Sequence, residues 1–399
     1  MYIFFITSFD CQSVTQTSSP PPFPIDYVVY SFRLNTPEKV GTPKKRQLLE
    51  ETPYGILKVK ADAVPDDNTD AIKICVADTG YDLDHPDLPK GDDVTGTSEV
   101  RDSWDNDPNS HGTHVAGTIA AIGGNSIGVR GVIDNNNVKL HISKVLSNFG
   151  IGSTSGVIDG YESCVENGAK VINMSLGGGG YLQGFQDAIT DAYNNGVVTV
   201  AAAGNEGLNI YGYPASYDHV LSVASITSSN QRSSFSNYND KVDIAAPGSS
   251  VKSTVNGGGY DTFSGTSMAS PHVAGVAALV WSTKPSLTNQ QLMDILIDSA
   301  TDLGSPGYDI YYGHGLVNAE AAYNLAQNPD ATRSPTAAPT MAPTPSTVSC
   351  RGYNSYLSCQ PVDGCFWYPS RSKCFSCALI QVESNCDLAR CTWTGSSCE

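Results

Sequence analysis

Apolar runs rich in β-branched residues alternate with stretches of helical periodicity through most of the chain. Such runs are typical of buried strands, and the stretches between most of them are typical of amphipathic or buried helices. The predicted strands are 71–78, 138–146, 169–176, 197–204, 220–226 and 242–247. Because this alternation joins most strands to the next through a crossover helix, we expect an α/β fold with a parallel sheet flanked by helices on both faces.

Polar residues stand at the carboxyl ends of several predicted strands. Asp78 ends the run ICVAD, Asn205 follows the run VTVAAAG, and the segment 175–178 follows a further strand. Open α/β sheets place their functional sites at this edge. We therefore expect these residues to lie near one site.

A serine at the start of another apolar run is the candidate nucleophile. In GTSMASPHVAG, Ser267 precedes small and apolar residues that predict a buried helix, and the free N–H groups of a helix start favour negative charge. Pro271 is expected in the first turn, where a missing N–H removes no intrahelical bond. A serine nucleophile needs a base, and His111 in HGTHVAG begins a second helical run.

These residues together can perform acyl transfer. Asp78 would orient the imidazole, His111 would transfer the proton, and Ser267 would attack. Asn205 and the Ser267 N–H would hold the oxyanion. Each motif also has a structural explanation when taken alone: a turn at Asp78, a helix cap at His111 and a strand-end turn at Asn205. The four together favour catalysis, whereas His114 and His272 have no separate catalytic task and are expected to be structural.

With these motifs the chain resembles the subtilisin family of serine proteases. The resemblance extends from about Pro53 to Tyr323 and includes VINMSLGG at 171–178 and SSFSNY at 233–238. It implies a subtilisin-like sheet and an endopeptidase whose triad has the order Asp78, His111, Ser267, which is the order of the family itself.

The resemblance also implies how a peptide substrate is held. An extended peptide would add as a strand to two backbone edges, and small residues would leave a pocket for a large apolar or aromatic side chain before the scissile bond. Glu206 at the pocket rim would also admit Lys or Arg. The implied substrate-binding residues are Phe149, Gly150, Gly152, Ser175, Leu176, Gly177, Ala202, Gly204 and Gly212.

A structural calcium ion is a further implication, since members of the family often bind one. Carboxylate, amide and carbonyl oxygens form the mixed ligand set that this hard cation prefers. The matching residues are Glu50, Asp87, Asn125, Ile127 and Val129, with Asp243 at a second cation position. The loop 122–125 is one residue longer than the family pattern.

Charge and cysteine usage limit the partners and the compartment. The formal net charge of −17 argues against nucleic acid and anionic membranes as partners, and no apolar stretch is long enough to span a bilayer. Eight of the eleven cysteines fall in 348–399. Such density indicates disulfides and therefore a secreted protein. For Cys75 and Cys164, in contrast, we expect buried, unpaired thiols.

The last 52 residues form an internal repeat of two four-cysteine units. Each unit has a tryptophan two residues after its third cysteine, Trp367 and Trp393. Units this small need disulfides for stability, and a zinc site is disfavoured because the segment has no histidine. The pairing within each unit stays open among three connectivities. The tryptophans are expected to fill small cores, with binding of a glycan or a cell-surface protein as the alternative.

The chain thus divides into four regions. An N-terminal lead over 1–46 is expected to hold a possible signal, poor as a secretory signal, and a partial propeptide, and the peptidase domain covers 47–327. A Pro/Thr-rich linker follows over 328–347, and the disulfide-rich module covers 348–399. The basic cluster 44–46 is either a processing site, with a mature start near Gln47, or an ordinary surface cluster.

We expect a secreted serine endopeptidase that acts on polypeptides. The alternative is a catalytically silent relative that serves as a binding protein directed by its cysteine-rich tail. Intact catalytic residues count against that alternative.

Overall fold

The computed structural model describes residues 28–30, 50–65, 71–135, 138–328, 365–368 and 373–376. The predicted secretory signal, the basic cluster 44–46, nearly all of the linker and the cysteine pairing of the tail lie outside these residues. The chain divides into two compact units, Met1–Thr332 and Arg333–Glu399. None of the helices in the described ranges has the length and apolar character needed to cross a bilayer.

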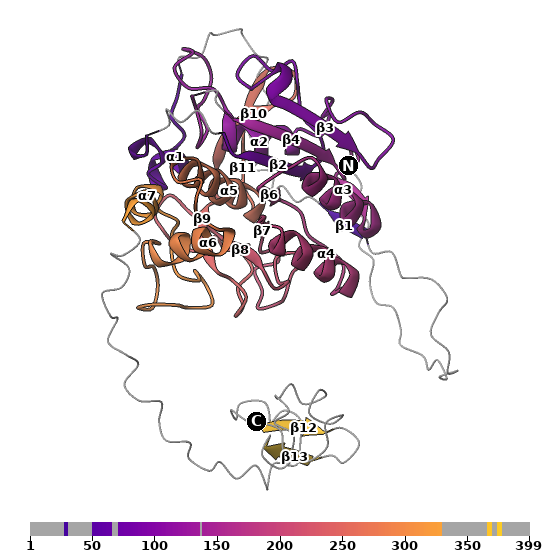
Figure 1. Cartoon of the computed structure of the whole chain (residues 1–399), viewed down its shortest axis with the longest axis vertical. Helices are drawn as coiled ribbons and strands as arrows, with labels where there is room; N and C mark the ends of the chain where they lie inside the picture. Colours follow the sequence, from indigo (N-terminus) through magenta and orange to yellow (C-terminus); the bar gives the residue numbers. More distant parts are fainter. Residues whose placement is uncertain are drawn as a thin grey trace. The chain divides into compact units, whose positions relative to one another are not determined.

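A seven-stranded parallel sheet forms the centre of the first unit (Figure 1). Its strand order is β3-β4-β2-β6-β7-β8-β9. The strands are β2 (Lys73–Asp78), β3 (Val94–Ser98), β4 (Lys139–Lys144), β6 (Val171–Met174), β7 (Val198–Ala202), β8 (Val220–Ile226) and β9 (Ile244–Pro247). All six predicted strands are therefore present. The edge strand β3 was not predicted, because only Val94 of its five residues is buried.

Helices cover both faces of this sheet, as the sequence predicts. On one face, α5 (Thr266–Thr283) packs against β6 to β9, and α2 (His111–Ala120) packs against α5 and β2. On the other, α3 (Thr154–Glu166) and α4 (Gln183–Asn194) cover β4, β2 and β7. Along β2, Ile74 and Val76 enter one buried cluster while Cys75 and Ala77 enter the other. Burial on both faces explains the continuous apolar run of this strand.

Shorter elements complete the described part. These are α1 (Tyr54–Lys58), η1 (Ala61–Ala63), η2 (Gly91–Asp93), α6 (Asn289–Asp298) and α7 (Ala319–Gln327). An antiparallel hairpin joins β10 (Val251–Val255) to β11 (Gly259–Phe263), and β1 (Val28–Tyr30) pairs antiparallel with β5 (Ile151–Ser153). In the second unit, β12 (Cys365–Tyr368) pairs antiparallel with β13 (Lys373–Ser376), inside the first four-cysteine repeat.

The strand order determines where a site can form. The chain leaves β2 toward β3 and β4, whereas it leaves β6 in the opposite direction, toward β7. A crevice therefore opens beyond the carboxyl ends of β2 and β6, where the connections diverge. Asp78 is the last residue of β2, and Ser175 directly follows β6.

The structure corrects the expectation for the two cysteines outside the tail. Cys75 in β2 and Cys164 in α3 form a disulfide with a Cα–Cα distance of 5.7 Å, and both are fully buried. The sequence predicts unpaired thiols, because each residue alone looks like an apolar core position. They meet because α3 packs on the face of β2 to which Cys75 points, and this contact spans 89 residues of sequence.

Candidate active site

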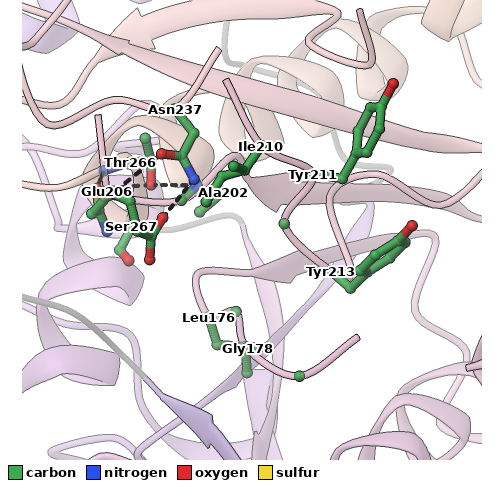
Figure 2. A pocket seen from close by; sticks show the side chains of 15 residues that line it. Leu176, Gly178, Ala202, Glu206, Ile210, Tyr211, Tyr213, Asn237, Thr266 and Ser267 are labelled. Atoms are coloured by element: carbon green, nitrogen blue, oxygen red, sulfur yellow. Dashed lines mark hydrogen bonds between the residues drawn. The ribbon is translucent and has the colours of Figure 1, made fainter. Parts of the chain in front are cut away.

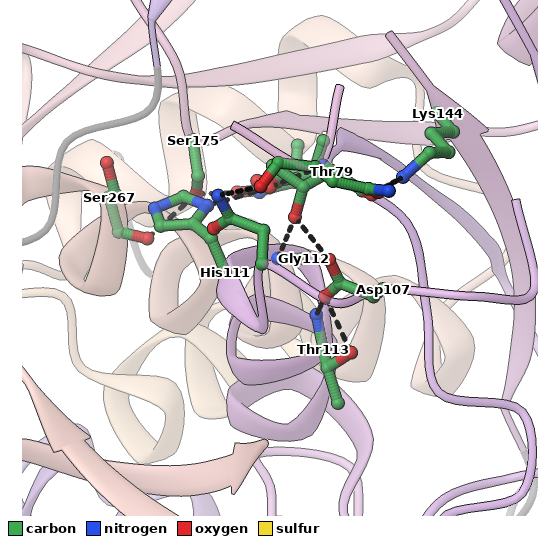
Figure 3. Close-up of polar contacts among 12 residues, drawn as sticks. Thr79, Asp107, His111, Gly112, Thr113, Lys144, Ser175 and Ser267 are labelled. Atoms are coloured by element: carbon green, nitrogen blue, oxygen red, sulfur yellow. Dashed lines mark hydrogen bonds and ion pairs between the residues drawn. The ribbon is translucent and has the colours of Figure 1, made fainter. Parts of the chain in front are cut away.

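Asp78 and His111 form a buried pair at the carboxyl end of the sheet. His111 Nδ1 lies 2.7 Å from Asp78 Oδ1, and both side chains have at most 1% exposure. The same carboxylate oxygen accepts the Thr79 backbone N–H at 2.7 Å. His111 Nε2 has no hydrogen-bond partner among the described residues, and Figure 3 shows Ser267 beside the imidazole ring. The geometry places a histidine between a carboxylate and a serine.

Close backbone packing brings these two residues together. Gly112 lies against the loop after β2, where a Cβ on Gly112 would come within 2.2 Å of Gly80 O. Only glycine permits that approach, and it allows the first turn of α2 to contact the end of β2. The sequence HG at 111–112 thus has a steric reason as well as a chemical one.

A buried aspartate that the sequence analysis did not single out supports the same contact. Asp107 accepts hydrogen bonds from Thr79 Oγ1 at 2.8 Å and from the Thr113 N–H at 2.8 Å (Figure 3). Thr79 Oγ1 in turn accepts the Gly112 N–H at 2.9 Å. Lys144 Nζ donates to Thr79 O, and burial lowers the pKa of this lysine. An acidic residue just before HGTH is the sequence signal that could have identified Asp107.

Ser267 is the second residue of α5, so its N–H has no intrahelical acceptor. The prediction of a helix start at Ser267 is therefore confirmed. Pro271, however, is the sixth residue of α5, beyond the first turn that the sequence predicts for it. At this position proline removes an N–H that would otherwise bond within the helix.

Asn205 lies beside the start of α5. Its Oδ1 accepts hydrogen bonds from the Thr266 N–H at 2.8 Å and from Thr266 Oγ1 at 3.0 Å. These bonds fix the amide and leave Nδ2 as the group that can donate elsewhere. Thr266, which the sequence analysis did not assign, is thus the residue that orients Asn205.

A cavity of about 240 Å³ opens next to Ser267 (Figure 2). The predicted residues Leu176, Gly177, Ala202, Gly204 and Gly212 line it, together with Asn205 and Ser267. Seven further residues without a predicted role also line the cavity. Gly178, Asn237 and Thr266 lie within motifs of the family resemblance. The other four come from loops without a recognisable pattern, and they are Gly179, Ile210, Tyr211 and Tyr213. Glu206 also lines the cavity, where its carboxylate accepts Asn237 Nδ2 at 2.5 Å.

The predicted edge at 149–152 carries another part of the same chain. In the antiparallel register, Val29 of β1 stands opposite Gly152 of β5. Val29 is only 3% exposed and joins the buried cluster that contains Leu176. Phe149, just before β5, is 88% exposed. The β5 edge therefore accepts an extended strand, and here that strand comes from the N-terminal lead.

The two remaining buried histidines of this region have structural partners. His114 Nε2 lies 3.0 Å from Val251 O, and His272 Nδ1 lies 2.8 Å from Met268 O. Burial lowers the pKa of His114 to about 3 and that of His272 to about 4. Both are therefore neutral at pH 7.

The five residues matched to a calcium site meet around one loop. Asp87 lies 2.6 Å from the Asn125 amide and accepts the Val129 N–H at 2.9 Å, while Asn125 Oδ1 accepts the Ile127 N–H. Glu50 accepts two backbone N–H groups of the same loop at 2.9 and 3.0 Å. Burial raises the pKa of Asp87. These residues could hold a cation, which would stabilise the desolvated carboxylate of Asp87, and Glu50 closes the loop.

Comparison with known proteins agrees with this geometry. The family model "Subtilase family" matches residues 69–315. Subtilisin from Bacillus pumilus is 44% identical over 282 residues, which cover 68% of this chain and 99% of that protein. Subtilisin E from Bacillus subtilis (strain 168) is also 44% identical over 282 residues, covering 68% of this chain and 71% of the relative.

A solved structure shows the same fold. The psychrophilic subtilisin-like protease Apa1 from the Antarctic psychrotroph Pseudoalteromonas sp. AS-11 superimposes with a TM-score of 0.66 at 29% identity. The match covers 70% of this chain and 99% of that structure. On the agreement of family model, identity and fold, the chain belongs to the subtilase family of serine proteases.

Proposed function

We propose that this protein is a serine endopeptidase whose triad is Asp78, His111 and Ser267. The observation that carries the proposal is the buried bond of 2.7 Å between Asp78 Oδ1 and His111 Nδ1, which leaves Nε2 available on the side of Ser267. An imidazole held in this way accepts a proton at Nε2 while its Nδ1–H stays bonded to the carboxylate.

The reaction proceeds by two acyl transfers. Ser267 Oγ bonds to the substrate carbonyl carbon as its proton moves to His111 Nε2. Asn205 Nδ2 and the Ser267 N–H stabilise the oxyanion. The C–N bond then breaks, and His111 gives its proton to the leaving amine. Water repeats the sequence on the acyl-enzyme, which releases a carboxylic acid and restores the Ser267 hydroxyl.

For the substrate we propose an extended polypeptide with a large apolar or aromatic residue before the scissile bond. The cavity of about 240 Å³ beside Ser267 has room for such a side chain, and glycines and Ala202 form part of its wall. Glu206 would also admit Lys or Arg. Cleavage of a peptide library should show these preferences, and a profile dominated by small residues would contradict them.

The strand β1 of the N-terminal lead occupies the substrate edge, which would make the full chain a zymogen. Val29 is buried opposite Gly152 at the edge to which a substrate strand would add. Val29→Asp should therefore raise the rate at which the unprocessed chain labels with a fluorophosphonate, since a charged side chain disfavours burial. An unchanged rate in a folded variant would reject this role.

A structural calcium ion would be held by Asp87 and Asn125 with the Ile127 and Val129 carbonyls, in a loop that Glu50 closes. Asp243 marks a second cation position. Removal of calcium should lower the melting temperature of the wild type more than that of Asp87→Asn. Equal stability with and without chelator would reject the calcium site.

The protein acts outside the cell. A disulfide between Cys75 and Cys164 and eight further cysteines in the tail suit an oxidising compartment. For the tail, the candidate partners are a glycan or a cell-surface protein. Binding of the full chain to cell-wall polymers, compared with a chain ending at 332, tests that role.

Active-site labelling tests the central proposal. The wild type, after processing, should react with a fluorophosphonate probe, and Ser267→Ala should not. No labelling of a folded and processed wild type would overturn the catalytic proposal and favour a binding protein.

A further inference from the structure

The helix that carries the nucleophile lacks one internal hydrogen bond at the nucleophile itself. In a regular α-helix, the carbonyl of Ser267 accepts the N–H of the residue four positions later. That residue is Pro271, which has no N–H, and it lies inside α5. Ser267 is only 2% exposed. An unpaired carbonyl in such a place would cost free energy, so another donor is needed.

Ser175, the residue directly after β6, supplies that donor. Its Oγ lies 2.8 Å from Ser267 O, and Ser175 is fully buried. Because Asn173 Nδ2 donates to the same Oγ at 2.9 Å, the hydroxyl proton is directed toward the Ser267 carbonyl. Asn173 Oδ1 in turn accepts Ser270 Oγ at 2.7 Å, which returns the network to α5. Two bonds of this network, from Ser175 to Ser267 and from Ser270 to Asn173, join the end of β6 to the first turns of α5.

We propose that the Ser175 hydroxyl is a positioning element for the nucleophile, replacing the hydrogen bond that Pro271 removes. The inference rests on the proposed function of Ser267. It assigns to the Ser175 side chain a task apart from backbone binding of a peptide. Fixing the Ser267 peptide orients the N–H that meets the oxyanion and the Cα that carries Oγ. The same contact ties the nucleophile to the segment 175–177 of the substrate wall.

The test combines two substitutions. Ser175→Ala should lower kcat roughly tenfold, equal to about 1.4 kcal/mol, while KM stays within about twofold, because only the alignment of the nucleophile is lost. Pro271→Ala alone should leave kcat near the wild-type value. In the double variant the new N–H of residue 271 can bond to Ser267 O, so kcat should recover most of the loss.

Two further variants separate positioning from general stability. Ser143 is a matched control, since it is also fully buried and donates to a backbone carbonyl, Gly160 O, at 3.0 Å. Ser143→Ala should lower the melting temperature without lowering kcat. Ser175→Cys, a weaker donor of similar shape, should give an intermediate kcat. If Ser175→Ala does not fold, the kcat values of Ser175→Cys and of the double variant test the inference instead.

The outcomes are distinct. A wild-type kcat in folded Ser175→Ala, or no recovery in a folded double variant whose parent Pro271→Ala is active, would overturn the inference. Failure of the proposed function itself would appear earlier, as a folded wild type that does not react with the fluorophosphonate. Recovery of kcat by Pro271→Ala in the Ser175→Ala background supports positioning, because a merely destabilised core would not be repaired there.

Discussion

Removing the disulfide between Cys75 and Cys164 should cost a large part of the stability of the peptidase domain. The bond closes a loop of 89 residues, for which chain entropy predicts about 4.5 kcal/mol at 25 °C. Both sulfurs are fully buried, so Cys75→Ala/Cys164→Ala also removes packing atoms. We expect a loss of roughly 4 to 6 kcal/mol in the free energy of unfolding.

Urea unfolding followed by tryptophan fluorescence measures this loss. The chain should carry Ser267→Ala in all samples, so that self-cleavage does not distort the equilibrium. An uncrosslinked chain exposes more surface when unfolded, so the slope m should rise together with the fall in stability. Val157→Ala, in the same buried cluster, is the control, because it creates a cavity without changing m.

Two results would refute this reasoning. A loss below about 2 kcal/mol with an unchanged m would mean that the pair does not constrain the unfolded chain. A large fall in activity at 25 °C, measured with Ser267 intact, would also contradict it. β2 is held between β4 and β6, so Asp78 should keep its position without the disulfide.

Other predictions concern single side chains. Burial raises the pKa of Asp243 to about 6, so the stability that its protonated form contributes below pH 4 is lost as the pH rises through 6. In Asp243→Asn, the free energy of unfolding should lose roughly 3 kcal/mol of this pH dependence, measured by urea titration without calcium. Burial lowers the pKa of His272 to about 4, so stability is lost as the pH falls from 6.5 to 4. The melting temperature of His272→Asn should therefore fall less over this pH range than that of the wild type. An equal fall in both proteins would exclude His272 as a cause of the acid sensitivity. Asn205→Ala should lower kcat by a factor of about 10² to 10³ and leave KM little changed. This general figure itself comes from a subtilisin. An unaltered kcat would exclude Asn205 as an oxyanion donor.

The local pattern of the sequence was sufficient for the strands that are buried on both faces. β2 and β8 stand out because apolar residues predominate in them, as burial on both faces of the sheet requires. The hairpin β10–β11 and the edge strand β3 are partly exposed, so their mixed composition hid them. The start of α5 at Ser267 was also readable, but the place of Pro271 within it was not, since the run of small residues does not mark the first helical residue.

The sequence by itself determined the α/β class, the motifs that contain Asp78, His111, Ser267 and Asn205, and the cysteine-rich tail. These follow from periodicity and from residue types at short range. Only the tertiary structure decided which distant residues meet: Cys75 with Cys164, Asp107 with Thr79, Val29 with Gly152, and Ser175 with the carbonyl of Ser267. Such contacts depend on strand order and on which helix face meets the sheet, and a local pattern contains neither.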